Sequence, residues 1–318
     1  MAEIVLGIGT SHGPQLNMAP DLWPLLHGKD KIDRRIDYQA LLAQARPGIE
    51  QELTPEKWQE RYDACHIALR RLKEKLEETH PDAIVVVGDD QREQFLDDNM
   101  PMFSVFYGPS MPITHRQRED AAPWQQAERQ GEAHLPSSVP CEESLARHLI
   151  DSLRDDEFDI AVSNQLKPSV GLGHAFTFLY RYLHPEGRTP MVPLMVNTFF
   201  PPNQPTPRRC YALGRSLRSA IESWDSERRV AVVASGGLSH TIIEEDLDQM
   251  VLDALMEKDT ETLGSLPMER LVRGTSEIRN WVALGGAVEP LDMTLVDYVP
   301  CYRYPASTGC AMGFAYWQ

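Results

Sequence analysis

One unit recurs along this chain and constrains its fold more than any other feature. Each unit is a short run rich in β-branched residues that ends in Gly, Ser, Asn or Asp and is followed by a loop and a helical pattern. This order is typical of an α/β sheet whose strands are mostly buried on both faces. The runs predict strands at residues 4–8, 83–87, 103–107, 160–163, 191–196 and 230–234, and more weakly at 293–299 and 311–316.

Apolar residues spaced three and four apart predict the helices. The clearest stripe lies within residues 55–78, and similar stripes predict helices at 143–153, 209–224 and 244–255. A cap signal at residues 274–276 predicts a further helix over 276–285.

The domain organisation follows from the length and from two exceptions to the helical and strand patterns. Stretches near residues 18–60 and 108–140 are polar and rich in proline, and we expect irregular insertions there rather than core elements. The 318 residues contain no internal repeat and suffice for a sizeable core. We therefore expect a single large α/β domain, with a mostly buried mixed central sheet flanked by helices and with two irregular insertions.

Composition narrows the class of partner. The chain has 47 acidic and 31 basic residues, which leave a net charge of −16. A protein that binds nucleic acid needs a basic surface, so no nucleic-acid partner is expected, and a small-molecule or protein partner is left. Five cysteines without a CxxC pair are typical of reduced thiols and favour the cytoplasm. The first residues carry no basic leader and the longest apolar runs have strand length, so neither secretion nor a membrane partner is expected.

Three loops place candidate chemistry directly after predicted strands, where α/β proteins tend to bind ligands. His12 lies in a glycine-rich turn whose third glycine comes one residue late for a dinucleotide-binding loop. Gln91 follows the Asp89–Asp90 pair; such a run could serve a cation or orient a neighbouring histidine, although a solvated acidic turn is its commoner meaning. His240 follows two glycines, lacks the G-x-S-x-G pattern of a hydrolase serine, and is a candidate general base.

Two further residues are site candidates only when they are considered together with these three. His174 precedes an apolar helix start and Glu277 falls in a first helical turn, so a capping role and a helix-dipole role explain them equally well on local grounds. A hydrogen bond to backbone would likewise explain His12 taken alone. Histidines and a glutamate from separate loops nevertheless suit a site for a divalent first-row metal. The other histidines are expected to be structural or solvated: His27, His66, His80, His115, His134, His148 and His184.

Five separated segments carry a family resemblance: residues 10–14, 197–202, 209–214, 235–240 and 277–287. In their order and residues, the sequence resembles the class III extradiol ring-cleavage dioxygenases, typified by the catalytic β subunit of protocatechuate 4,5-dioxygenase. The resemblance covers most of the chain apart from the insertions, and the single-chain branch that acts on gallate and 3-O-methylgallate is the most similar.

The resemblance implies a function and a role for each residue. It implies non-haem Fe(II) bound by two histidines and a carboxylate, with His12 and Glu277 among the ligands, His240 as base and His174 as acid. The implied reaction is extradiol cleavage of a substituted catechol, such as gallate, 3-O-methylgallate, protocatechuate or a related lignin-derived aromatic. Both atoms of O₂ would enter the product, and the implied assembly is a homodimer.

The chain departs from that family at one ligand. Gln91 stands where the family usually carries its second iron-binding histidine, and a glutamine carbonyl is a weaker, harder donor than imidazole. Three explanations stay open: Gln91 or a neighbouring aspartate binds the metal, a histidine from an insertion such as His115 or His134 replaces it, or the site has lost normal iron chemistry. The first is favoured, and Gln91 is the ligand predicted here.

Two alternatives to the dioxygenase also stay open. One is a metal-dependent lyase or hydrolase of the same fold that acts on a phenolic substrate without O₂. The other is a non-catalytic binding protein. A carboxylated substrate would be expected to contact a cationic or backbone donor, and the arginine candidates are Arg92, Arg116, Arg118 and Arg279.

Overall fold

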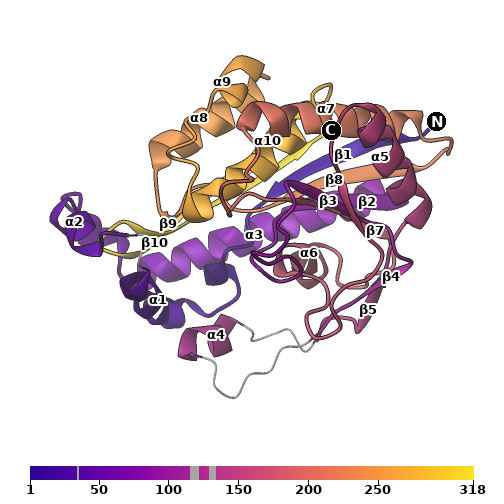
Figure 1. Ribbon diagram of the computed structural model, residues 1–318. Coiled ribbons are helices and arrows are strands. Elements are labelled where there is room, and N and C mark those ends of the chain that lie inside the picture. The colour runs from indigo at the N-terminus through magenta and orange to yellow at the C-terminus, as the bar shows by residue number, and fades with distance from the viewer. Residues whose placement is uncertain (34–35, 115–121, 129–133) are drawn as a thin grey trace.

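The computed structural model describes residues 1–33, 36–114, 122–128 and 134–318, and a mixed sheet forms its centre (Figure 1). In the described residues the strand order is β10-β11-β1-β8-β2-β7-β3-β6, with β9 paired to β11. The strands are β1 (Glu3–Thr10), β2 (Ala83–Gly88), β3 (Phe103–Phe106), β6 (Ala161–Ser163), β7 (Met191–Val196), β8 (Arg229–Ser235), β9 (His240–Ile242), β10 (Met293–Tyr304) and β11 (Thr308–Trp317). A separate ribbon pairs β4 (Ser110–Pro112) with β5 (Ser138–Pro140).

The strand directions explain why the sheet is mixed. In the middle, β1, β8, β2 and β7 run parallel, and β2 and β7 are buried along their whole length. Toward the edges, β11 runs antiparallel to β1 and β10, and β3 runs antiparallel to β7. The expected α/β domain with a mixed central sheet is confirmed, and all eight expected strands are present. The short strands β4, β5 and β9 had no recognisable pattern.

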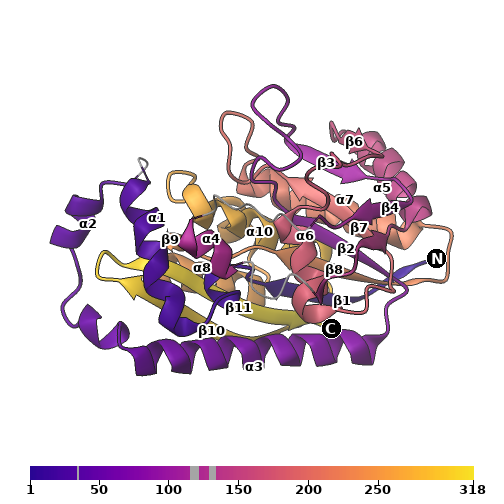
Figure 2. The ribbon, with the colours of Figure 1, turned by 90° about the horizontal axis from the view of Figure 1, so that it is seen from below.

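Helices cover both faces of this sheet (Figures 1 and 2). On one face α7 (Pro207–Ser223) packs against α10 (Ile278–Ala287), which contacts β8, β1 and β2. On the other, α3 (Pro55–Thr79) contacts β10, β11 and β1, and α6 (His174–Phe178) contacts β2 and β8. The remaining α-helices are α1 (Leu26–Ile32), α2 (Tyr38–Ala43), α4 (Pro123–Glu128), α5 (Glu143–Asp155), α8 (Glu245–Met256) and α9 (Thr260–Gly264). Short 3₁₀ segments are Pro14–Leu16, Pro20–Leu25, Ile49–Glu52 and Arg273–Glu277, and Leu179–Leu183 is a π-helical turn.

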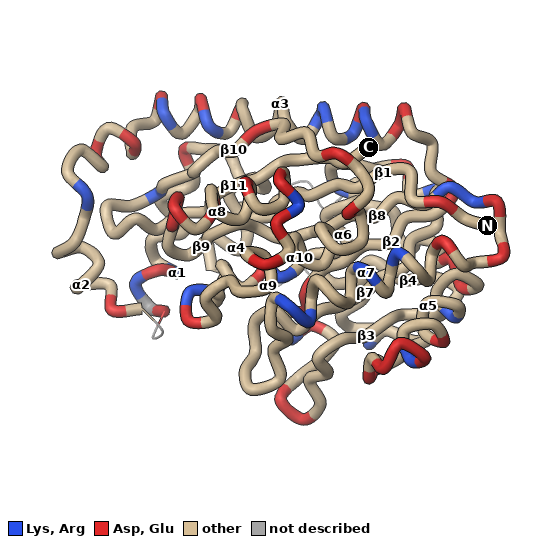
Figure 3. Tube along the Cα trace, turned by 90° about the horizontal axis from the view of Figure 1, so that it is seen from above, with Lys and Arg blue, Asp and Glu red and all other residues tan. Residues whose placement is uncertain are grey.

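The long helix α3 shows how sequence sets the packing. Its N-cap, Thr54, accepts a hydrogen bond from the Lys57 amide at 3.2 Å. The apolar stripe is buried against the sheet: Cys65, Ala68, Leu69, Leu72 and Leu76. Ion pairs such as Lys73–Glu77 lie on the opposite face, where acidic and basic residues alternate along the helix (Figure 3).

The two stretches expected to lack core elements do contribute to the core, so that part of the prediction was wrong. Buried apolar side chains occur in both: Trp23, Leu26 and Ile49 in the first, and Met111, Ile113 and Val139 in the second. The indole nitrogen of Trp23 donates to the Gln15 carbonyl at 3.1 Å. These apolar residues are isolated in sequence, and periodicity detects only repeated ones.

The helix expected over 276–285 begins later than its cap signal indicated. A 3₁₀ turn occupies Arg273–Glu277, and α10 begins at Ile278 without a side-chain cap. The Thr275 hydroxyl instead lies 3.2 Å from the backbone nitrogen of His240 and 3.3 Å from its carbonyl oxygen. A tertiary partner has replaced the local cap.

The cysteines and the helices bear on two further expectations. All five cysteines are buried and free, which confirms the expected reduced thiols. Among the residues that the structure describes, no helix has the length and apolar character needed to span a membrane.

Candidate metal centre

The five predicted site residues come together at the carboxyl ends of the central parallel strands. Parallel neighbours β1, β8 and β2 end there, and His12, His240 and Gln91 follow these strands within a few residues. Glu277 comes from the turn before α10, and His174 begins α6. Parallel strands bring their carboxyl ends to the same edge, which is why loops so distant in sequence meet.

Glu277 is the centre of these contacts and is fully buried. Its Oε2 lies 3.4 Å from His12 Nε2 and accepts a hydrogen bond from the Gly237 amide at 2.7 Å. Its Oε1 lies 3.1 Å from His240 Nε2 and accepts from the side-chain amide of Gln91 at 3.2 Å. Burial alone would raise the pKa of Glu277, but His240, His12 and the Gly237 hydrogen bond together lower it to about 2. The carboxyl group is therefore ionised.

Each site histidine has its Nδ1 occupied, which leaves Nε2 for the site. The partner of Nδ1 is Ser235 Oγ at 3.0 Å for His12, Glu93 Oε2 at 2.8 Å for His174, and the Leu238 carbonyl at 2.9 Å for His240. The rings of His12 and His174 are 4.9 Å apart in an edge-on arrangement. Histidines that bind metals through one nitrogen typically have the other held in this way.

The histidines differ in their protonation. Burial lowers the pKa of His12 to about 4, so its imidazole is neutral at pH 7, as a metal ligand must be. Burial also opposes the charge on His174, but the carboxylate of Glu93 outweighs it and raises that pKa to about 10. Glu277 likewise outweighs burial and raises the pKa of His240.

Asp89 provides the test of whether a metal fits. It is 0 % exposed, and neither carboxylate oxygen has a hydrogen-bond partner among the described residues. Burial, followed by the charge on Glu277, raises its pKa to about 8. Donor atoms of His12, Asp89 and His174 lie within 4.8 Å of one another. A buried carboxylate without a partner is costly, and a bound cation would remove that cost, so a divalent metal fits beside Asp89 and the neutral imidazole of His12.

Two glycines enclose the ring of His240. A Cβ atom on Gly274 would lie 2.1 Å from His240 Cδ2, and one on Gly237 would lie 2.6 Å from Nδ1. The next residue, Thr241, has φ = 70°, which is strained for a β-branched side chain. A side chain at either glycine would therefore collide with this imidazole.

Three residues that support the site escaped the sequence analysis. Glu93 orients His174 and Ser235 contacts His12, while Asp248 of α8 holds the turn before His240. Glu93 belongs to the polar run after β2. That run indicated that a site lies after this strand, but not that Glu93 orients His174. Asp248 is a polar residue within an amphipathic helix and carried no signal.

We expect the Asp248→Ala variant to lose about 3 kcal/mol of unfolding free energy. Asp248 is buried and accepts hydrogen bonds from the Ser239 amide and hydroxyl, both at 2.6 Å, and from the Tyr298 hydroxyl at 2.8 Å. The alanine variant would leave these donors unpaired. Urea denaturation measures the loss, with Asp253→Ala on the exposed face of the same helix as the control. Equal stability of the two variants would contradict this role.

The sequence also offered arginines that could bind a substrate carboxylate and histidines that could replace the missing ligand. Arg279 is fully buried and donates to backbone carbonyls, the nearest being Pro205 O at 2.8 Å, so it cannot bind a substrate carboxylate. Arg92 is exposed and pairs with Asp97 at 2.8 Å. Outside the described residues lie Arg116, Arg118 and His115. His134 is exposed.

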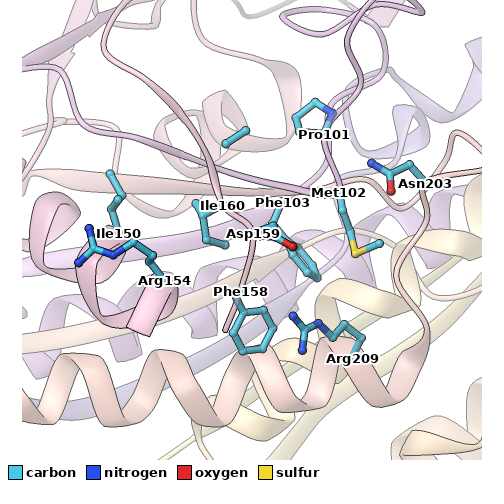
Figure 4. A pocket seen from close by; sticks show the side chains of 11 residues that line it. Pro101, Met102, Phe103, Ile150, Arg154, Phe158, Asp159, Ile160, Asn203 and Arg209 are labelled. Atoms are coloured by element: carbon cyan, nitrogen blue, oxygen red, sulfur yellow. The ribbon is translucent and has the colours of Figure 1, made fainter. Parts of the chain in front are cut away.

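A surface pocket of about 610 Å³ lies beside β3 and β6, at the end of the strand order (Figure 4). Phe103 and Phe158 line it together with Arg154 and Arg209. None of the predicted site residues lines this pocket.

The chain belongs to a family described as the catalytic LigB subunit of aromatic ring-opening dioxygenase. The family profile matches residues 47–312. Gln91, His174, His240 and Glu277 fall within the matched residues, and His12 precedes them. The family resemblance found in the sequence is confirmed.

Curated relatives match a smaller part of the chain. A gallate dioxygenase of Pseudomonas putida is 34 % identical over 182 residues, which are 53 % of this chain and 51 % of the relative. A 2,3-dihydroxyphenylpropionate/2,3-dihydroxicinnamic acid 1,2-dioxygenase of Comamonas testosteroni is 29 % identical over 173 residues, 54 % of this chain and 47 % of the relative. The chain thus spans about half the length of these relatives.

Proposed function

We propose that this protein is an Fe(II)-dependent extradiol dioxygenase that opens the ring of a substituted catechol with O₂. The observation that carries the proposal is the meeting of His12, Glu277, His174 and His240 around one buried cluster, in a chain of the ring-opening dioxygenase family. The relatives are named for gallate and for dihydroxyphenyl substrates. These names support a substrate such as gallate, 3-O-methylgallate, protocatechuate or a related lignin-derived aromatic.

The proposed roles follow from the contacts of each side chain. His12 and Glu277 would hold the metal together with one residue of the loop after β2, where the sequence predicts Gln91. Bound iron would supply adjacent positions at which the two catechol hydroxyls and O₂ meet. Because the charge on Glu277 is what raises the pKa of His240, sharing that charge with a cation would free Nε2 to accept a proton from a substrate hydroxyl. His174, protonated beside Glu93, would donate a proton as the ring opens.

Anaerobic loading with Fe(II), followed by an oxygen-electrode assay, tests this proposal. The substrate panel is protocatechuate, gallate, 3-O-methylgallate and larger biaryl catechols. We expect one O₂ consumed for each ring-opened product. We also expect His12→Ala and Glu277→Ala to lose iron and activity together, because both remove a ligand. Glu78→Ala, an exposed change on α3, is the control.

The alternative is a metal-dependent lyase or hydrolase that acts on a phenolic substrate without O₂. The presence of Gln91 in place of a histidine favours it. Bound iron without oxygen consumption on any catechol would support this alternative and contradict the dioxygenase. A homodimer and a cytoplasmic location stay predictions from the sequence.

A further inference from the structure

We propose that Asp89, and not Gln91, is the metal ligand that takes the place of the missing imidazole beside His12. This inference rests on the proposed function only in assuming that the protein binds a divalent metal. It assigns to Asp89 a role that the family pattern does not predict, and to Gln91 a role as a positioning residue for Glu277.

The first argument is the contrast between two neighbouring aspartates. Asp90 is buried and its oxygens accept hydrogen bonds from the amides of Glu93, Gln94 and Phe95, at 2.9, 2.7 and 3.3 Å. It is therefore explained as the residue that closes the turn after β2. Asp89 is equally inaccessible, but both of its oxygens lack such a partner among the described residues. The hydrogen bonds of the turn account for the buried carboxylate of Asp90, but they do not account for that of Asp89.

The second argument is distance. Asp89 Oδ1 lies 4.0 Å from His12 Nε2, and Glu277 Oε2 lies 3.4 Å from the same nitrogen. Two ligand atoms that are each roughly 2.1 Å from one ion lie at most about 4.2 Å apart. The distance from His12 Nε2 to Asp89 Oδ1 and the distance from His12 Nε2 to Glu277 Oε2 are therefore both short enough for the two atoms of each pair to bind one ion.

The third argument concerns Gln91. The side-chain nitrogen of Gln91 lies 3.2 Å from Glu277 Oε1. An ionised carboxylate only accepts hydrogen bonds, so the amino group of the amide, and not its carbonyl oxygen, faces Glu277. Toward Asp89 the Gln91 amide acts in the same sense, because it lowers the pKa of that carboxyl group and so favours its ionised form. Gln91 is thus placed as a donor that holds the carboxylates, while a metal ligand must be an acceptor.

The proposed ligand changes the character of the site. With a metal bound, Asp89 and Glu277 would both be ionised, and a divalent cation would neutralise their two negative charges. Oxygen-rich donor sets favour hard ions such as Mn²⁺ and Fe²⁺ relative to sets that are rich in imidazole or thiolate. Mn²⁺ is therefore a suitable probe, because its binding can be measured without turnover.

The experiment measures Mn²⁺ binding to the full chain by calorimetry and by the paramagnetic resonance of free Mn²⁺. We expect one ion per wild-type chain. We expect Asp89→Asn to weaken binding by more than about 100-fold, because loss of an outer contact alone costs 10–100-fold. Gln91→Ala should weaken it by about 10- to 100-fold, because it removes only an outer contact to Glu277. Asp97→Asn, which removes an exposed charge from the same loop, is the matched control.

A second readout separates loss of binding from loss of structure. The Asp89→Asn side chain has the same shape as the carboxyl group, whose charge burial already disfavours in the absence of metal, so the metal-free variant should melt no lower than the wild type. Added Mn²⁺ should raise the melting temperature of the wild type and of Gln91→Ala, but not that of Asp89→Asn. Normal binding by Asp89→Asn, or its loss in Gln91→Ala alone, would overturn the assignment. Failure of the wild type to bind Mn²⁺ or Fe²⁺ would overturn the proposed function as well.

Discussion

The His240→Ala variant is expected to keep its metal and to lose turnover by about 10²- to 10⁴-fold, the usual contribution of a positioned general base. Its Nδ1 is held by the Leu238 carbonyl, so only Nε2 is available to take a proton. Gly237 and Gly274 enclose the ring, and its removal leaves a space of imidazole shape. Added imidazole should therefore restore part of the activity. Metal content, kcat and rescue are measured on the same preparations.

The control for this prediction is His148→Ala on α5, which removes a histidine whose hydrogen-bond partners lie on α7 and on α5 itself. It should leave both metal content and turnover unchanged. Near-normal turnover of His240→Ala would refute the role as base. A parallel loss of metal would instead make His240 a ligand.

The Arg279→Met variant is expected to lose about 3–5 kcal/mol of unfolding free energy. The guanidinium group is fully buried and donates to the carbonyls of Pro205, Thr198 and Leu271, at 2.8, 3.2 and 3.0 Å. Methionine fills much of the same volume but leaves these carbonyls unpaired. Because Arg279 lies two residues after Glu277, the start of α10 should loosen as well. Urea denaturation and Mn²⁺ affinity measure the two effects.

Two further variants make this result specific. Arg279→Lys keeps the charge but cannot reach the diverging carbonyls together, so it should recover only part of the stability. Arg215→Met, on an exposed part of α7, removes a guanidinium that is 60 % exposed and should leave the stability unchanged. A loss below about 1 kcal/mol in Arg279→Met would show that water or backbone movement satisfies the carbonyls.

The sheet was predictable because its strands carry their own pattern. Runs such as residues 83–87 and 191–196 are apolar throughout, which occurs where a strand is buried on both faces. The helix α3 was equally clear from its stripe. The short strand β9 was missed, because its three residues are held by pairing with β11 rather than by their own propensity.

The candidate site was predictable in its place but not in its contacts. The position of His12, Gln91 and His240 after strands indicated that they share an edge of the sheet. The sequence did not indicate that Asp89 is buried without a partner, or that Glu93 and Ser235 hold the histidines. These are pairings between loops, and which loops meet depends on the order of the strands. Arg279 shows the same limit, since a charged residue in a helix is ordinarily exposed.

The sequence by itself determined the fold class, the strands and the family, because periodicity and motif residues are local and repeat along the chain. Only the tertiary structure decided which polar side chains are buried and what each one contacts. Asp89 illustrates this, because His12 and Glu277, which act on its carboxyl group, are distant in sequence, whereas the amides bonded to Asp90 lie within the next five residues. The free energy of a buried charge depends on the groups that surround it in space, and sequence neighbours are a small part of those groups.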